Sequence, residues 1–291
     1  MGIVILGANG NLGVQLQKQF KDDLIAAWDH ADFNFLDFNE LTEQLKKIKP
    51  KIIINVAAYN AVDDCEKSEK EEALAYIINR DLPAVLSDYC LINDIKLMHY
   101  SSDYVFGVEQ RRIEAYNELS IPGPINKYGE SKLAGEKEIA KRALEGLNYY
   151  IIRSSRLFGP KVNNQFSKAS FFKVMLNLAE KNRQVKAVDG ELSCFTYTPD
   201  LAEASFDLLS DNAPRGVYHL INSGLSTWYE AAEHLYNMFD FDLELLAVKS
   251  EDWFRPAKRP SFSVLKNTRR RLLRPWQEAL NEYLKSENLI H

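Results

Sequence analysis

Short apolar runs alternate with longer amphipathic stretches through the first half of the chain. The apolar runs that predict strands are residues 3–6, 24–28, 51–56, 96–100 and 149–153. The stretches with helical spacing run from the first glycine-rich turn through Phe20, and then over residues 40–49, 73–95 and 128–143. This alternation predicts an α/β protein with a parallel sheet covered by helices on both faces.

The rhythm loosens beyond Gly159. Residues 170–180 and 198–209 predict helices, and residues 185–188 and 216–221 predict strands. Thr198 followed by Pro199 is typical of an N-cap with proline at the first helical position. Thr227 and Glu230 have the spacing of a capping box, which predicts the start of another helix.

Composition narrows the class of protein. Hydrophobic residues make up 46% of the 291 positions and charged residues 26%, as in ordinary soluble domains. The formal net charge of −5 argues against an obligate nucleic-acid binder but leaves a small anionic ligand possible. Three widely spaced cysteines, Cys65, Cys90 and Cys194, form neither a disulfide framework nor a zinc motif. Without a membrane-length apolar run or a signal peptide, we expect a cytoplasmic protein with no membrane partner.

A glycine-rich segment, GANGNLG, joins the first predicted strand to the first predicted helix. Its candidate cofactor-binding residues are Gly7, Asn9, Gly10, Asn11, Leu12 and Gly13. Glycines here let the backbone approach a diphosphate, and the helix N-terminus favours the anion. The strand–turn–helix context favours a dinucleotide site over a plain tight turn, although the spacing is GxxGxxG rather than GxGxxG.

Asp29 ends the second predicted strand. A carboxylate there can bind the adenosine ribose hydroxyls and would repel a 2′-phosphate. An ordinary solvated turn explains the same residue equally well, so the choice between NADH and NADPH stays open.

A serine at a strand end and a Tyr–Lys pair on a helix form the candidate catalytic group. Tyr128 and Lys132 are four residues apart and so share one helix face, while Ser102 follows a parallel strand whose carboxyl end faces the ligand crevice. Reducing a ketone requires a hydride and a proton for the developing alkoxide. A lysine ammonium would lower the pKa of a neighbouring tyrosine toward working pH, and a serine hydroxyl can orient the carbonyl and stabilise the oxyanion. A surface tyrosine and lysine on an amphipathic helix are the alternative.

At these residues the chain resembles the dTDP-4-dehydrorhamnose reductase family of extended short-chain dehydrogenases/reductases. The resemblance runs nearly end to end. It rests on the ordered segments GANGNLG, NVAAY (55–59), IN (78–79), SSDYVF (101–106), NKYGESKLAGE (126–136), IRSS (152–155), TYTPDLA (196–202), GVYHL (216–220) and Arg259-Pro260.

The resemblance implies a fold and a set of roles. The fold is a Rossmann-type doubly wound parallel sheet, formed by residues 1–155 plus about 185–215, with a smaller discontinuous C-terminal substrate domain formed by about 156–184 plus 216–291. The implied cofactor-binding residues, besides the glycine loop, are Ala57, Ala58, Tyr59, Asn79, Tyr128 and Lys132. Tyr128 would be the proton donor and Lys132 its electrostatic partner, with Ser102 standing where the family usually carries threonine. Asp103, Tyr104, Arg156 and Arg259 would contact the substrate.

Two positions depart from the family pattern. Arg156-Leu157-Phe158 stands where many members have Trp-Val-Tyr, so the sugar pocket differs there. Gln15 replaces a glutamate implicated in Mg²⁺-bridged dimers of some bacterial members, so we predict no metal site and leave a homodimer open.

The expected activity is NAD(P)H-dependent reduction of the 4-keto group of a 6-deoxy nucleotide sugar, with dTDP-4-dehydrorhamnose as the leading candidate. Another nucleotide-deoxysugar 4-reductase and a non-catalytic regulatory subunit on the same fold are the alternatives. Retention of Ser102, Tyr128 and Lys132 disfavours the regulatory alternative. The nucleotide base and the sugar stereochemistry stay undetermined by sequence.

Overall fold

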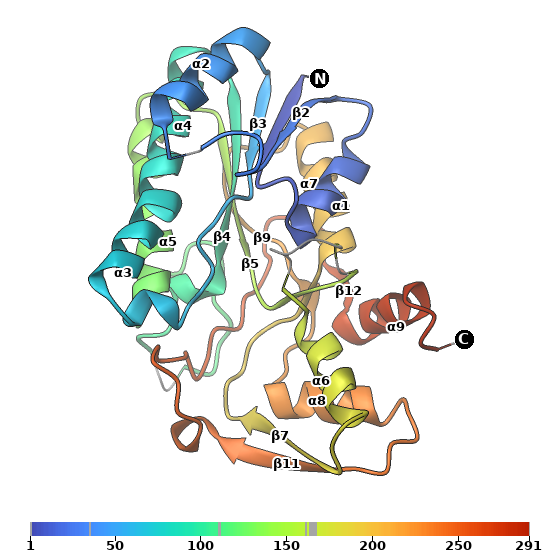
Figure 1. The fold of residues 1–291 in the computed structure, drawn as a ribbon. Coiled ribbons are helices and arrows are strands. Elements are labelled where there is room, and N and C mark those ends of the chain that lie inside the picture. Colours follow the sequence, from blue (N-terminus) through green and yellow to red (C-terminus); the bar gives the residue numbers. More distant parts are fainter. Residues whose placement is uncertain (1, 35, 110–111, 161, 163–167, 291) are drawn as a thin grey trace.

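A six-stranded parallel sheet forms the centre of the molecule (Figure 1). In spatial order its strands are β2 (Leu24–Trp28), β1 (Ile3–Leu6), β3 (Ile52–Asn55), β4 (Lys96–Ser102), β5 (Tyr149–Ser154) and β9 (Gly216–His219). The computed structural model describes residues 2–34, 36–109, 112–160, 162 and 168–290. The chain changes direction across the sheet between β1 and β3, which is where open α/β sheets form their ligand crevice.

Helices cover both faces of this sheet, as predicted. One face carries α1 (Asn11–Gln19) and α7 (Thr198–Ser210), and the other carries α2 (Phe38–Ile48), α4 (Leu82–Ile92) and α5 (Lys127–Ala143) (Figure 1). Neighbouring residues of each strand point to opposite faces, so Ile5 packs under α1 while Val4 packs under α2 and α4. The doubly wound arrangement is confirmed.

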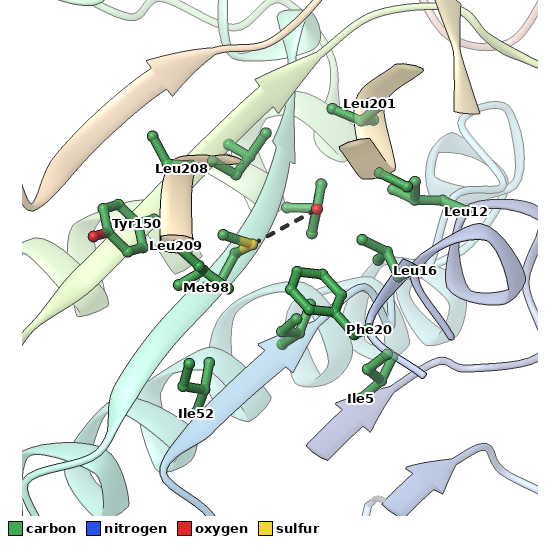
Figure 2. Packing of buried hydrophobic residues seen from close by; sticks show 14 of the residues in the cluster. Ile5, Leu12, Leu16, Phe20, Ile52, Met98, Tyr150, Leu201, Leu208 and Leu209 are labelled. Atoms are coloured by element: carbon green, nitrogen blue, oxygen red, sulfur yellow. Dashed lines mark hydrogen bonds between the residues drawn. The ribbon is translucent and has the colours of Figure 1, made fainter. Parts of the chain in front are cut away.

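The core under α1 and α7 joins distant parts of the sequence (Figure 2). Leu12, Leu16 and Phe20 from the first helical segment meet Leu201 and Leu208 from α7 over the strands. The C-terminal part of the chain therefore completes the nucleotide-binding half.

A smaller lobe lies below the sheet in Figure 1. It contains α6 (Phe171–Ala179), α8 (Trp228–Tyr236), α9 (Trp276–Ser286) and the parallel pair β7 (Gln184–Asp189) and β11 (Glu244–Lys249). Two short parallel pairs are β6 (Leu157–Phe158) with β8 (Thr196–Tyr197), and β10 (Asn222–Ser223) with β12 (Leu273–Pro275). Aromatic rings fill its core, including Phe172, Phe195 and Trp276, which lie 5.0–5.9 Å apart between centroids.

The expected division of the chain at about 185–215 needs correction. β7, expected in the Rossmann half, pairs instead with β11 in the smaller lobe. β9, expected in the substrate half, extends the central sheet by pairing with β5. Both segments are short apolar strands, and their sequences do not determine which neighbouring strand each one pairs with.

Two local predictions also differ from the structure. The stretch 73–95 is interrupted by a π-helical turn, Ile77–Asp81, between α3 (Glu69–Tyr76) and α4. The N-cap of α7 is Tyr197 rather than Thr198. Within the described residues, the Tyr197 side chain makes no capping hydrogen bond. The capping box of Thr227 and Glu230 is confirmed.

The described part of the chain also contains single-turn 3₁₀ segments at Asp64–Glu66, Asp103–Val105 and Ser250–Asp252. Within the described ranges, every helix is too short or too polar to cross a lipid bilayer.

Candidate active site

A cleft of about 410 Å³ opens at the carboxyl ends of β1, β3, β4 and β5. Most of the predicted site residues line it: Gly7, Gly10, Asn11, Leu12, Gly13, Ala58, Ser102, Asp103, Tyr104, Tyr128, Lys132 and Arg156. The described residues that line the cleft do not include Asn9, Asp29, Ala57, Tyr59, Asn79 or Arg259. The glycine loop and the Ser–Tyr–Lys group, which are about 90 residues or more apart in sequence, therefore face one space.

The glycines of the loop serve different purposes. Gly7 has φ +80°, and a Cβ there would lie 2.6 Å from the amide nitrogen of Ala57, while one on Gly13 would lie 2.3 Å from the Gly7 carbonyl oxygen. Both glycines are needed for the fold itself. A Cβ on Gly10 would meet only that oxygen, at 3.4 Å, so the protein leaves space there that a ligand can use.

Gly10 is also the N-cap of α1, and no side chain in the described ranges caps that helix. The N-terminus of a helix attracts anions through its amide groups and its dipole. The open cradle beside Gly10 and this exposed helix start together fit the diphosphate of a dinucleotide.

Asp29 supports the loop from behind. Its carboxylate accepts hydrogen bonds from the amides of Asn9, at 3.0 Å, and His30, at 2.8 Å. A role at the adenosine ribose stays a prediction, because the structure shows this buried carboxylate stabilising the loop backbone.

Asn79 and Tyr59 stand behind the cleft rather than in it. The Asn79 side chain is completely buried, accepts from the Tyr59 amide at 3.0 Å and donates to the Tyr59 carbonyl at 3.0 Å. It also donates to the Ser131 hydroxyl at 2.9 Å. Through these bonds Asn79 joins the segment after β3 to α5, and its contact with the cofactor stays a prediction.

Close helix packing brings α5 to the cleft. A Cβ on Gly129 would lie 2.1 Å from the Tyr104 carbonyl oxygen, and one on Gly135 would lie 2.1 Å from the Asn79 carbonyl oxygen. These contacts explain the two glycines of YGESKLAGE. They hold the helix close enough for Tyr128 and Lys132 to reach the carboxyl end of β4.

Lys132 is buried and donates from Nζ to the carbonyl oxygen of Tyr100 at 2.6 Å. Burial lowers the pKa of this ammonium to about 8, and the nearby Glu136 carboxylate offsets part of that effect. The lysine is therefore held at the cleft with a pKa well below that of an exposed ammonium.

Tyr128 is also buried and packs edge-on against Tyr104, with ring centroids 5.6 Å apart. Burial raises its pKa, a hydrogen bond with the Ser102 side chain acts in the opposite direction, and the Asp103 charge raises the pKa further. The expected lowering of this pKa by Lys132 is thus wrong for this structure. A raised pKa keeps the phenol protonated, as a proton donor requires.

Ser102 and Asp103 form a network beneath Tyr128. The Ser102 hydroxyl donates to Asp103 Oδ1 at 3.1 Å and accepts from the Tyr104 amide at 3.2 Å. Asp103 Oδ2 lies within 2.9 Å of the hydroxyls of Ser155, Ser193 and Ser263. The Asp103 carboxylate, expected to contact substrate, is therefore occupied by serine hydroxyls.

Arg156 faces the cleft from the segment after β5. Its guanidinium lies 3.9 Å from the Trp228 ring centroid and donates to the carbonyl oxygens of Ser226, at 2.9 Å, and Glu191, at 2.7 Å. Its backbone has φ +36°, an uncommon conformation for a residue with a side chain. These contacts hold the cation in one orientation.

Arg259 lies to one side of the cleft. Its guanidinium donates to Asp63 Oδ2 and to the Ala257 carbonyl, both at 2.8 Å. Arg270, by contrast, pairs with Asp211 on the outer surface of the sheet domain.

Lys168 and Trp228 are among the further cleft residues that escaped prediction. Asn11 donates from its side chain to the Lys168 carbonyl at 3.0 Å, and Lys168 Nζ lies 3.4 Å from Asn60 Oδ1. Both residues lie outside the strand-end and helix-face patterns that mark the other candidates.

Gln15 is buried in α1, within hydrogen-bonding distance of Lys18. Among the residues that the structure describes, no group of three His, Cys, Asp or Glu side chains could hold a metal ion.

A nucleotide-binding loop and a Ser–Tyr–Lys group facing one crevice of a parallel sheet are the features of extended short-chain dehydrogenases/reductases. Within that class, the chain belongs to the family described as the RmlD substrate binding domain, whose model matches residues 1–289.

Individual relatives extend over the whole chain. A spore coat polysaccharide biosynthesis protein, SpsK, of Bacillus subtilis (strain 168) is 32% identical, over 98% of each chain. A crystal structure of a dTDP-4-dehydrorhamnose reductase from Clostridium acetobutylicum ATCC 824 has a TM-score of 0.88 and 31% identity, covering 99% of this chain and 100% of that one. The dTDP-4-dehydrorhamnose reductase of Bacillus anthracis str. Ames, solved in complex with NADP, has a TM-score of 0.87 and 30% identity, over 98% of each chain.

Proposed function

We propose that this protein catalyses the NAD(P)H-dependent reduction of the 4-keto group of dTDP-4-dehydrorhamnose to give dTDP-L-rhamnose. The observation that carries the proposal is the single cleft in which the glycine loop faces Ser102, Tyr128 and Lys132. The family match and the reductases among its relatives support the substrate.

The charge of the cleft also supports a nucleotide-sugar substrate. Lys132, Arg156 and Lys168 line it, and Asp103 is the one acidic residue among the described lining residues. Since the Asp103 carboxylate is covered by hydroxyls, the cleft presents mostly positive charge. Such a cleft favours the diphosphates of a dinucleotide and of a nucleotide sugar.

The protein's own groups would divide the work as follows. The cradle beside Gly10 and the start of α1 would hold the cofactor diphosphate, and the cofactor supplies the hydride when bound. Tyr128 would donate the proton to the developing alkoxide. Lys132 would add positive charge beside the reacting carbonyl and bind the cofactor ribose. Arg156, Tyr104 and Arg259 would orient the sugar nucleotide, because arginine can bind a diphosphate with paired hydrogen bonds.

The reaction would take place in a reducing compartment, the cytoplasm. The three cysteines are free and buried, as expected for a protein that does not depend on disulfides. The proposed activity requires neither a nucleic-acid nor a membrane partner. Sedimentation of the purified protein would test whether it forms a homodimer.

Cofactor oxidation tests the proposal. Purified protein would be mixed with NADPH or NADH and with dTDP-, UDP-, GDP- and CDP-linked 4-keto-6-deoxysugars, and the loss of reduced cofactor would be followed. We expect the largest kcat/KM with dTDP-4-dehydrorhamnose. Preference for another of these sugars would favour the alternative of a related 4-reductase. The observation behind that alternative is Arg156, which lines the cleft where many family members have tryptophan. Cofactor binding without turnover of any of them would favour the regulatory subunit.

A further inference from the structure

Glu191 is a buried carboxylate of the smaller lobe, with 2% of its surface exposed. It follows β7, and Ser250 follows β11. Because these strands pair in parallel, with Asp189 opposite Lys249, their carboxyl ends lie side by side. Glu191 Oε1 accepts hydrogen bonds from the Ser250 hydroxyl and from Arg255 Nη2, and Oε2 accepts one from Arg255 Nη1 at 3.2 Å. These bonds hold the carboxylate in one orientation.

The Glu191 carboxylate also holds a residue of the cleft. Trp228, the first residue of α8, donates from Nε1 to Glu191 Oε2 at 3.0 Å. An indole has a single N–H, which lies in the plane of the ring, so this bond determines how the ring is turned. The Arg156 guanidinium lies 3.9 Å from the Trp228 ring centroid, where the π electrons attract a cation. Glu191 is thus connected to two side chains that line the cleft.

Main-chain bonds hold Arg156 from a second side, whatever side chain stands at position 191. The guanidinium donates to the carbonyl oxygens of Ser226, at 2.9 Å, and Glu191, at 2.7 Å. The segments that carry these carbonyls are joined by reciprocal main-chain bonds between Ser193 and Ser226, at 3.2 and 3.0 Å. Within the described residues the two carbonyls occupy two of the five N–H groups of the guanidinium, so others remain for a ligand in the cleft.

We propose that Glu191 is a positioning residue, whose carboxylate fixes the Trp228 ring so that Arg156 presents its remaining N–H groups to the sugar nucleotide. The carboxylate is occupied by Trp228, Ser250 and Arg255, so it acts through Trp228 rather than on the substrate. The inference rests on the proposed function and adds to it a residue that orients the substrate side of the cleft. Its loss should therefore weaken binding of the sugar nucleotide and spare the chemical step.

Glu191→Met removes the carboxylate and keeps a side chain of similar length. We expect KM for dTDP-4-dehydrorhamnose to rise about 10-fold, as for the loss of one hydrogen bond to a charged group, while kcat changes less than about 3-fold. The affinity for NADPH should stay unchanged, because the cradle beside Gly10 is formed by other residues. A fall in kcat with KM preserved would overturn the role in substrate binding.

A double-mutant cycle tests whether the effect passes through Trp228. Trp228→Phe keeps a ring beside Arg156 but removes the N–H, so it should raise KM by itself. In that background Glu191→Met should raise KM less than about 2-fold further. Additive effects of the two substitutions would show that Glu191 acts elsewhere. An unchanged KM in Trp228→Phe would also overturn the proposal, and this variant keeps the Glu191–Arg255 pair if Glu191→Met does not fold.

Arg255→Met is the matched control, because it removes another partner of the carboxylate and leaves Trp228 in place. We expect it to lower Tm, since it breaks a largely buried ion pair, while KM stays within about 2-fold of that of the unmodified protein. A rise in KM equal to that of Glu191→Met would mean that Glu191 acts by holding residues 250–255, and would contradict the role assigned to Trp228.

The indole N–H signals in NMR spectra give a readout that needs no substrate. Protein labelled with ¹⁵N-tryptophan has four tryptophans, and the side-chain signal missing from Trp228→Phe belongs to Trp228. We expect this signal to move and to exchange faster with solvent in Glu191→Met, because its acceptor is gone. An unchanged Trp228 signal in Glu191→Met would contradict the positioning role. Because this comparison does not use turnover, it separates a failure of the inference from a failure of the proposed function.

Discussion

The side chain of Lys132 on α5 is bonded to the main chain of Tyr100 on β4, with 2.6 Å between Nζ and the carbonyl oxygen. This bond spans the junction of the helix and the sheet two residues before Ser102. It holds the ammonium at the cleft while burial lowers its pKa to about 8.

The first prediction is a loss of activity at alkaline pH. As pH rises through about 8, Lys132 loses its proton, and the positive charge that assists the reaction disappears. We therefore expect kcat/KM to fall above about pH 8, measured with saturating cofactor. Lys132→Met should lower kcat/KM at every pH, and its pH profile should lack the fall above about pH 8. A profile that stays flat to pH 10 in the unmodified protein would contradict the assignment.

Tyr128→Phe should nearly abolish turnover while cofactor binding survives. The substitution removes the donated proton but keeps the ring that packs against Tyr104. General acid catalysis contributes about 10²–10⁴-fold to a rate, so kcat should fall by that range. Steady-state kinetics and NADPH fluorescence titration measure the two properties. Tyr89→Phe, on the buried face of α4, is the control. Retention of over half of the rate by Tyr128→Phe would argue against a proton-donor role.

The glycine loop offers a pair of substitutions with opposite consequences. Gly10→Ala should leave Tm near that of the unmodified protein but weaken NADPH and NADH binding, and Gly10→Val should weaken it further, because the added side chain enters the open cradle. Gly13→Ala should lower Tm, because its Cβ would lie 2.3 Å from a backbone oxygen. Cofactor titration and thermal unfolding distinguish these effects. Equal cofactor affinity in Gly10→Val and the unmodified protein would exclude this surface as the diphosphate site.

Three arginines differ in their relation to the cleft, which only Arg156 of the three lines. Arg156→Ala should raise KM for the sugar nucleotide, because Arg156 lines the cleft in a fixed orientation. Arg259→Ala should also raise KM while NAD(P)H affinity stays unchanged. Arg270→Ala, at the outer surface, is the control. If Arg270→Ala impairs use of the sugar nucleotide and the other two do not, the substrate site has been placed on the wrong side of the sheet.

A buried ion pair one helical turn beyond Lys132 should matter for stability. Glu136 accepts two hydrogen bonds from Arg153, at 2.9 and 2.6 Å, and both side chains are buried. Glu136→Gln leaves a buried guanidinium without its counter-charge, which costs about 3–5 kcal/mol. Urea unfolding would measure this loss. Glu138→Gln removes a partly exposed partner of Arg142 on the same helix and should cost less than about 1 kcal/mol.

Local pattern predicted the parallel sheet because its information lies within each segment. The β-branched run over residues 51–56 is buried on both faces in β3, and the Tyr–Lys spacing does place Tyr128 and Lys132 on one face of α5. Which strand pairs with which is not determined within a single segment. β7 and β9 have sequences that suit either sheet, and only packing in three dimensions decides between them.

The same limit applies to the site. Ser102 could be recognised because a strand precedes it, whereas the surroundings of Asp103 could not, since Ser193 and Ser263 lie 90 and 160 residues further along the chain. The sequence marks Asp103 as polar and near the cleft. It does not show that the hydroxyls of Ser193 and Ser263 would contact its carboxylate.

The position of α7 has a consequence for folding during synthesis on the ribosome. Leu201 and Leu208 cover the same apolar face as Leu12 and Leu16, so that face stays open to water until about three-quarters of the chain has emerged. Domains of nascent chains generally fold as units. Here the first 155 residues lack the α7 residues that cover this face, so a nascent chain halted before α7 would leave the face open to a chaperone.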